Sequence, residues 1–143
     1  MKIGKINIQL DQGAVVPSRA HETDAGLDLY TREKVLIWGG QSHIFDTGVH
    51  IEFPPGFYGK IESKSGLNTK HGIVSAGGVI DEGFTGSICV KLYNLSNRHY
   101  IFEAEDKIAQ LIIQPYAVEE GFEIVQELQQ TERGDKGFGS SGK

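Results

Sequence analysis

The sequence predicts an all-β protein, a sandwich or a barrel, and three observations point to this class. Apolar and polar residues alternate in several short segments, for example at Ile6, Ile8 and Leu10. Glycine, proline and asparagine separate about ten such segments, which is typical of strands joined by turns. Only residues 67–71 have the character of a short helix, so helix contributes little to the expected fold.

The expected strands follow one another along the whole chain. Alternation predicts most of them, whereas residues 108–114 are a continuous apolar run around Gln110 that Pro115 ends. Turn sequences such as Pro54-Pro55-Gly56 separate the strands. In chain order, strands are expected at residues 6–10, 27–30, 35–38, 49–53, 59–63, 79–80, 88–93, 108–114 and 122–128.

The chain is expected to form one β domain followed by an arm. Its 143 residues are enough for one domain with a sizeable core, and we find no repeat and no linker. From Thr131 onward the sequence is rich in glycine and has one large apolar residue, Phe138, so this segment cannot build core. We therefore expect a β domain over residues 1–130 and a flexible C-terminal arm over residues 131–143.

Composition and charge exclude several classes of function. A net charge of -5 at pH 7 argues against nucleic acid or an acidic membrane as the main partner. The single cysteine, Cys89, excludes an intrachain disulfide, so a reducing, cytoplasmic compartment is expected. No apolar signal region follows Met1, and no apolar run is long enough to span a bilayer. The five histidines lack metal-ligand spacing, so no zinc site is expected.

Residues 77–86 are the first candidate for chemistry. Glycines on both sides of this stretch allow tight turns or a close approach to a ligand. Val79 and Ile80 predict a buried half-strand, which would hold Asp81 rigidly and partly desolvated, so that it can serve as a general base. Phe84 offers a flat face to a ring. The alternative is a β-hairpin with a polar turn, and the segment alone favours that alternative.

The arm is a second candidate, for phosphate binding. Residues 137–142 match the pattern G-x-G-x-x-G, but no strand closely precedes them and no helix follows, so a dinucleotide-binding site is excluded. Backbone N–H groups and two serine hydroxyls can still cradle phosphate. Arg133 and Lys136 add positive charge, and Phe138 adds a stacking face. The alternative is a flexible terminus without a role, and the aromatic and basic residues favour ligand binding.

Three further sites have two interpretations each. Lys64-Ser65-Gly66 precedes the expected helix and is either an anion site or a plain N-cap. Asp28 lies near a metal or is simply solvated on the polar face of a strand. Gln110 interrupts an apolar strand, so it is either a structural hydrogen-bonding residue, which we favour, or a ligand contact.

Five segments, in order and over nearly the whole chain, resemble the motifs of the homotrimeric deoxyuridine triphosphatase (dUTPase, dUTP diphosphatase) family. Any one of them is moderate support, whereas five at suitable spacing are strong support. They are residues 24–29 (DAGLDL), 64–67 (KSGL), 78–86 (GVIDEGFTG), 106–111 (DKIAQL) and 133–142 (RGDKGFGSSG).

The resemblance implies a jelly-roll-like β fold that forms a homotrimer with sites shared between subunits. It implies hydrolysis of dUTP to dUMP and pyrophosphate, which limits uracil incorporation into DNA and supplies dUMP for thymidylate synthesis. Asp81 would deprotonate the water that attacks the α-phosphorus, and Asp28 would hold the Mg²⁺ shell through waters. The other implied substrate contacts are Lys64, Ser65, Gly66 and Gln110 on phosphates, Gly78 on the uracil edge, Phe84 on the deoxyribose, and Arg133, Phe138, Gly139, Ser140 and Ser141 in the arm.

The chemistry of a triphosphate agrees with this assignment. Because both the substrate and the protein are anionic, local cations such as Lys64, Arg133, Lys136 and Mg²⁺ must neutralise the phosphates. Two residues depart from the family pattern. Lys64 supplies a point charge where the family usually has arginine, and Phe84 supplies a ring without the hydroxyl of the usual tyrosine. We expect reduced discrimination, not its loss.

Three other functions stay open. A dCTP deaminase of the same superfamily would need a catalytic glutamate in a different third motif, and Asp81 argues against it. A nucleotide-binding regulator on this fold could keep every motif and act through an unknown protein partner. A purely structural jelly roll would have no reason for the arm from Arg133 to Gly142.

Overall fold

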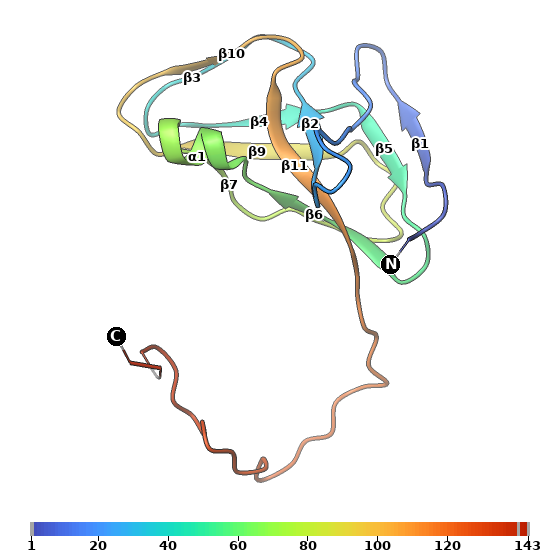
Figure 1. Cartoon of the computed structure of the whole chain (residues 1–143), viewed down its shortest axis with the longest axis vertical. Helices are drawn as coiled ribbons and strands as arrows, with labels where there is room; N and C mark the ends of the chain where they lie inside the picture. Colours follow the sequence, from blue (N-terminus) through green and yellow to red (C-terminus); the bar gives the residue numbers. More distant parts are fainter. Residues whose placement is uncertain (1, 140, 143) are drawn as a thin grey trace.

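The computed structural model describes residues 2–139 and 141–142, and these form eleven strands and one helix (Figure 1). The prediction of an all-β protein with one short helix is therefore confirmed. In chain order the elements are β1 (Asn7–Leu10), β2 (Leu27–Tyr30), β3 (Val35–Ile37), β4 (Ser42–Asp46), β5 (Val49–Glu52), β6 (Phe57–Glu62), α1 (Ser65–His71), β7 (Ile73–Ser75), β8 (Val79–Ile80), β9 (Cys89–Asn94), β10 (Tyr100–Phe102) and β11 (Lys107–Pro115).

The strands form four antiparallel sheets, arranged as a sandwich. The largest sheet has the order β2-β11-β6-β8, and a second has the order β4-β9-β7. Two-stranded sheets, β1-β5 and β10-β3, complete the domain (Figure 1). All four sheets are open, so the described residues form a sandwich and no closed barrel.

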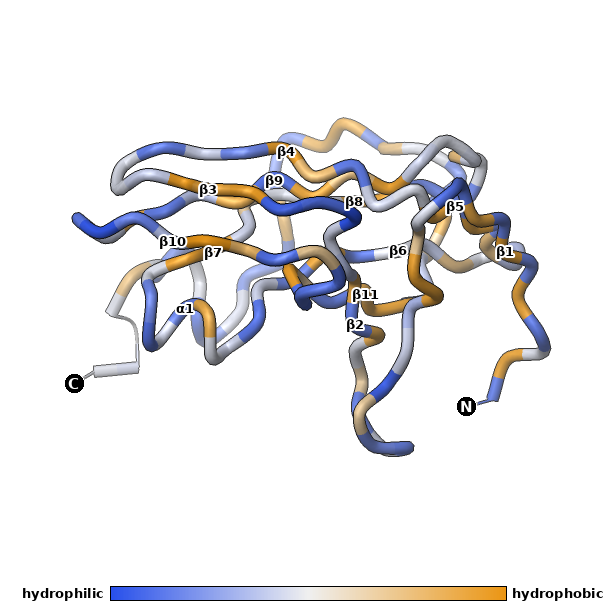
Figure 2. The backbone as a smooth tube through the Cα atoms, turned by 90° about the horizontal axis from the view of Figure 1, so that it is seen from above, coloured by the Kyte–Doolittle hydropathy of each residue, from blue (hydrophilic) through white to orange (hydrophobic). Residues whose placement is uncertain are grey.

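One hydrophobic core joins the sheets. In β9, alternate residues Val90 and Leu92 are buried, as expected for a strand with one face inward. Phe45 of β4 and Phe102 of β10 meet edge to face, with ring centroids 5.3 Å apart. Figure 2 shows the apolar stretches within the strands and hydrophilic residues in the connecting turns. The core members are Leu29, Val35, Ile37, Phe45, Val49, Ile51, Phe53, Ile61, Ile73, Ile88, Val90, Leu92, Phe102, Ile108, Ala109 and Leu111.

The helix α1 begins two residues before the predicted stretch. Lys64 has extended backbone and takes the N-cap position, and Leu67 packs against the core. Gly72 ends the helix with φ of 65°, a left-handed conformation that glycine adopts without strain. Among the described residues no helix has the length and apolarity that crossing a bilayer requires.

The predicted strand at residues 122–128 is wrong. The sheet ends at Pro115, and Tyr116 N–H donates to Gly56 O at 3.0 Å in the last backbone bond to the domain. Beyond it the chain runs away from the domain (Figure 1), and Phe122 and Ile124 are 91% and 99% exposed. Their alternation is that of a strand, but a strand needs a partner edge for its hydrogen bonds, and this segment pairs with no strand of the residues that the structure describes. The division at residue 130 stays a prediction.

Candidate active site

Three strands and the start of α1 bring the first group of predicted residues together. Gln110 of β11 lies opposite Asp28 of β2 on one side and opposite Glu62 of β6 on the other. Lys64 follows β6 directly, and its ammonium group pairs with Asp28. Lys107 Nζ lies 2.7 Å from the other Asp28 oxygen. Residues from the first, second and fourth family-like segments therefore form one cluster.

Asp28 is the charged centre of this cluster. Its side chain is 7% exposed, so it is far from simply solvated on a polar face. Burial acts to raise the pKa of Asp28, but hydrogen bonds from Lys107 and Lys64 lower it, and the pKa lies below its ordinary value. The carboxylate is thus ionised and bridges two cations.

Gln110 has a structural bond of the kind we favoured from sequence. Its Nε2 donates to Ser63 O at 3.0 Å, which ties β11 to the end of β6. Gly26 leaves room for this amide, because a Cβ there would lie 2.3 Å from Gln110 Oε1. The bond also fixes the amide beside Asp28 and Lys64, so the structural role is compatible with a ligand contact.

The start of α1 has free backbone N–H groups next to the Lys64 cation, and no side chain of the described residues caps it. Lys64 makes no capping hydrogen bond, since its ammonium group has no acceptor for the helix N–H groups, and this group pairs with Asp28. Ser65 and Gly66 follow in the first turn and are exposed. Helix N–H groups in the first turn have no partner within the helix, so this end can accept an anion.

Residues 78–86 form a second group on the edge of the largest sheet. Gly78 has φ of 119°, and a Cβ there would lie 2.5 Å from the Ile61 Cβ, so only glycine fits. Its carbonyl accepts a bond from Ile61 N–H at 2.8 Å. The strand β8 follows, but the prediction that Val79 is buried is wrong, since this residue is 66% exposed. The reason is that β8 is an edge strand, which has no neighbour beyond it.

Asp81 lies exposed at the end of β8, so one chain alone does not desolvate it as expected. It lines a pocket of about 500 Å³ together with Tyr58, Val79, Glu82 and Tyr116. The pocket is open and mixes aromatic, apolar and carboxylate groups, which suits a ligand with a ring and a polar edge.

Glu82 and Lys107 are site residues that the sequence reasoning missed. Glu82 Oε2 accepts hydrogen bonds from Tyr116 Oη at 2.6 Å and Gly56 N–H at 2.8 Å, and these bonds hold the pKa of Glu82 below its ordinary value. It thereby fixes the turn that bears Asp81. For Glu82, the signal in the sequence was its position next to Asp81 as a second carboxylate. For Lys107, the only signal was its position in the fourth family-like segment.

Phe84 is held in a tight turn after Asp81. Its N–H donates to Asp81 O at 3.0 Å, and its ring lies over Gly86, where a Cβ would come within 2.5 Å of the ring. The ring is 45% exposed, so one face is open. His50 fastens this turn to β5, with its Nδ1 2.8 Å from Thr85 O.

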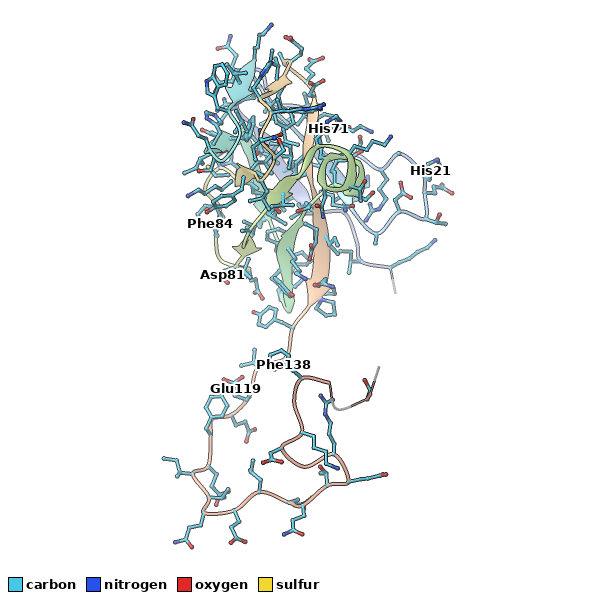
Figure 3. All side chains as sticks on the ribbon, turned by 90° about the vertical axis from the view of Figure 1, so that its left-hand side faces the viewer. His21, His71, Asp81, Phe84, Glu119 and Phe138 are labelled. Atoms are coloured by element: carbon cyan, nitrogen blue, oxygen red, sulfur yellow. The ribbon has the colours of Figure 1, made fainter. Side chains whose placement is uncertain are left out.

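The arm forms a third group, separate from the other two. Phe138 is fully exposed and lies on the arm, outside the domain that bears Asp81 and Phe84 (Figure 3). Arg133 Nε donates to Lys136 O at 3.2 Å, within the arm itself. Gly139 and Ser141 are exposed, and Ser140 lies outside the described residues. A single chain therefore does not bring the arm to either cluster.

The donor set limits how a metal can bind. Among the described residues no group of three or more His, Cys, Asp or Glu side chains has the geometry to hold an ion. Asp28 is nevertheless an ionised carboxylate beside the proposed phosphate contacts. Mg²⁺ commonly binds one or two carboxylates together with substrate phosphates and keeps several waters, so Asp28 fits the outer part of such a shell.

The fold defines the class first. Compared with solved structures, the chain has a TM-score of 0.90 and 30% identity to the Staphylococcus bacteriophage 80alpha dUTPase with dUpNHpp, covering 98% of this chain and 99% of that one. A mutant dUTPase from phage phi11 of S. aureus has a TM-score of 0.81 and 25% identity, covers 89% of this chain and 100% of that one, and was used to describe the coordination of a structural Mg(II) ion. This class is that of β-sandwich dUTPases.

Sequence comparison then identifies the family. Residues 12–142 match the family model described as dUTPase. The deoxyuridine 5'-triphosphate nucleotidohydrolase of Clostridium kluyveri is 41% identical, covering 94% of each chain, and that of Clostridium acetobutylicum is 40% identical, covering 99% of this chain and 96% of the relative. This chain belongs to the dUTPase family, so the resemblance noted from its five segments is confirmed.

Proposed function

We propose that this protein hydrolyses dUTP to dUMP and pyrophosphate, and so limits uracil incorporation into DNA and supplies dUMP for thymidylate synthesis. The observation that supports this most directly is the family match over residues 12–142, which includes the Asp81 segment and the arm. Asp81 argues against the related deaminase reaction, for which a glutamate in this segment would be expected.

Asp81 is proposed as the general base. It would take a proton from the water that attacks the α-phosphorus, and the pyrophosphate would leave. Its exposure in one chain is compatible with this role, because bound nucleotide and a closing arm would remove water around it. The bonds of Glu82 to Tyr116 and Gly56 keep the turn fixed while this happens.

The cluster around Asp28 is proposed to hold the triphosphate. Lys64, Ser65, Gly66 and Gln110 would contact phosphate oxygens, and Asp28 would orient waters of the Mg²⁺ shell. The ion supplies neutralisation of the phosphate charge. Lys64 can change its ion-pair partner when substrate binds. Its ammonium group can turn from the Asp28 carboxylate to a phosphate, because Lys107 keeps Asp28 neutralised.

The turn after β8 is proposed to select the base and the sugar. Backbone at Gly78 would bond to the uracil edge, and the open face of Phe84 would lie on the deoxyribose and exclude a 2′-hydroxyl. Phe138 of the arm would cover the uracil, and Arg133, Gly139, Ser140 and Ser141 would close over the terminal phosphates.

We propose that these groups meet only in a homotrimer. Among the described residues of one chain, the Asp28 cluster, the Asp81 turn and the arm are three separate groups, and the arm makes no hydrogen bond to the domain. The exposed apolar side chains of residues 122–128, and Phe138 of the arm, are expected to be covered by a neighbouring copy, since burying them is favourable. The single exposed thiol, Cys89, suits a reducing compartment, and we propose a cytoplasmic enzyme.

The test is pyrophosphate release from dUTP, UTP, dTTP and dCTP with Mg²⁺, in the parent protein and in Asp81→Asn. We expect dUTP to be preferred and the variant to lose activity by a factor on the order of 10² to 10⁴. The matched control is Glu119→Gln, which removes an exposed carboxylate from the segment between β11 and the arm (Figure 3) and should leave activity unchanged. Near-parental turnover in a folded Asp81→Asn protein would contradict the assignment of Asp81 as the general base.

A further inference from the structure

A second polar pocket lies at the α1 end of the domain, on elements that the proposed reaction does not use. It has a volume of about 410 Å³ and is lined by the last turn of α1 and by the turn between β9 and β10. Figure 3 shows its residue His71 on the helix, apart from Asp81 and Phe84. The side chains used below are Lys70, His71, Ser96, Asn97, Arg98 and His99.

The walls of this pocket are rigid. Asn94 is 1% exposed, and its Nδ2 donates to Arg98 O at 2.7 Å and to Ile37 O at 3.1 Å. Its Oδ1 accepts from Ser96 N–H at 3.0 Å, and Leu95 N–H donates to Gly72 O at 2.9 Å. The turn is therefore tied both to β3 and to the end of α1, and the basic side chains project from a fixed frame.

Trp38 stands next to the pocket and is also fixed. The ring of His99, which lines the pocket, meets the Trp38 ring edge to face with centroids 5.5 Å apart. Gly39 packs directly on the turn, since a Cβ there would come within 2.8 Å of the Ser96 and Asn97 backbone. Trp38 is 56% exposed, so an aromatic surface lies open beside the basic pocket.

The charge of the pocket is unusual for this protein. The chain has a net charge of -5, yet no acidic residue lines the pocket in the part of the chain that the structure describes. Lys64 and Lys107 of the candidate active site are paired with Asp28, whereas for Lys70 and Arg98 no carboxylate of the described residues lies within ion-pair distance. Lys70 and His71 also offset the negative end of the α1 dipole, which accounts for their position. The helix dipole does not account for the positions of Arg98 and Trp38, which lie outside α1.

We propose that this pocket binds a nucleoside phosphate, at a site separate from the one that holds dUTP. Lys70 and Arg98 bind the phosphate oxygens, with the imidazole groups of the pocket as further donors. The base stacks on Trp38, as bases stack on exposed aromatic side chains that stand beside cations. The proposal does not depend on the hydrolytic activity.

Trp38 is the only tryptophan of the chain, so the tryptophan fluorescence comes from this site. The experiment titrates the full-length protein with ADP, pyrophosphate and adenosine, because ADP is not the substrate of the proposed reaction. We expect saturable quenching by ADP, and weaker or no quenching by pyrophosphate or adenosine alone. Lys70→Gln and Arg98→Gln should each weaken ADP binding by about tenfold. Lys5→Gln removes the same charge from a different surface and should have no effect.

Calorimetry of ADP binding to Trp38→Phe and Trp38→Ala separates the two halves of the site. Trp38→Phe keeps a stacking face and should keep most of the affinity, whereas Trp38→Ala should lose it. Absence of saturable quenching, or equal ADP affinity in the parent and in both charge variants, would overturn the proposal. A single-stranded oligonucleotide that binds far more tightly than ADP, with the same dependence on Arg98, would overturn the assignment to a free nucleotide.

Discussion

Asp28 has both a structural role, through its ion pairs, and a proposed role in binding the Mg²⁺ shell. The sequence predicted it as a site residue, as it did Lys64 and Gln110, but it did not predict that Asp28 and Lys64 are bonded to each other or that Lys107 completes the cluster. These contacts depend on the pairing of β2 with β11, and a register between strands distant in sequence is set by the whole sheet.

The ion pairs of Asp28 predict how acid unfolds the protein. Because the folded pKa of Asp28 lies below its ordinary value of 3.8, the pairs stabilise the fold above that pH, and the stabilisation is lost as the pH falls through the folded pKa. Lys107→Met removes one cause of the lowered pKa, so acid unfolding should begin at a higher pH. Circular dichroism during acid titration measures this midpoint.

The control for that titration is Lys34→Met. Lys34 pairs with Glu103 at 2.8 Å, but both side chains are at least 60% exposed, and such pairs contribute little. Its acid midpoint should match that of the parent protein. Equal midpoints for Lys107→Met and Lys34→Met would show that Lys107 does not stabilise the Asp28 carboxylate.

Phe84 is expected to decide which sugar is accepted. Phe84→Ala opens the space beside the deoxyribose, so kcat/KM for UTP relative to dUTP should rise by about tenfold. Phe84→Tyr keeps the ring and restores the hydroxyl, so the ratio should fall below that of the parent. If the ratio is the same in all three proteins, another residue excludes the 2′-hydroxyl.

The elements were predictable where apolar alternation is regular. The strands around Ile8, Leu29, Ile51 and Leu92 lie where the pattern places them. The strand β4 was missed, since Ser42–Asp46 has only two apolar residues between polar ones, and it forms because it pairs with β9. Local pattern identifies strands that bury a regular face, and it fails where pairing supplies the stability.

For residues 122–128 the error is the opposite one, because the pattern predicts a strand that the structure lacks. This difference predicts a role for the segment in assembly. Phe122 and Ile124 alternate with polar residues but bury nothing in one chain. If a neighbouring copy covers them, Phe122→Ser with Ile124→Ser should lose about 1.5–3 kcal/mol of burial per side chain and weaken association. Sedimentation at decreasing protein concentration should then show earlier dissociation than in the parent.

Glu123→Ser is the matched control, because residue 123 would point to the other face of a strand. Its dissociation should follow that of the parent. Should the double variant stay as fully assembled as the parent at every concentration, the apolar residues of this segment do not contribute to the oligomer.

At the scale of the whole molecule, the separation of the three groups predicts complementation between inactive chains. One chain has Asp81→Asn and an intact arm, and the other ends at Glu132 with Asp81 intact. Each alone should be nearly inactive. In randomly mixed trimers about a quarter of the sites would combine an intact Asp81 from one chain with an intact arm from another, so activity should return to roughly that fraction of the parent.

The measurement is pyrophosphate release after co-refolding, with native mass spectrometry to verify that mixed trimers form. Refolding each chain by itself provides the baseline. Mixed trimers without restored activity would mean that Asp81 and the arm of each site belong to the same chain. The sequence alone could not establish this arrangement, because it depends on how copies pack and not on any one segment.

The contact between Gly26 and Gln110 has a consequence for how this sequence can diverge. A side chain at position 26 would displace the amide of Gln110 and break its bond to Ser63 O, whereas a shorter residue at 110 leaves position 26 undisturbed. Substitutions at the two positions are therefore tolerated best in one order, with the amide lost before the glycine. Among relatives, chains with a larger residue at position 26 should have a smaller one at position 110, and a relative with large residues at both should hold the side chain of residue 110 away from Ser63.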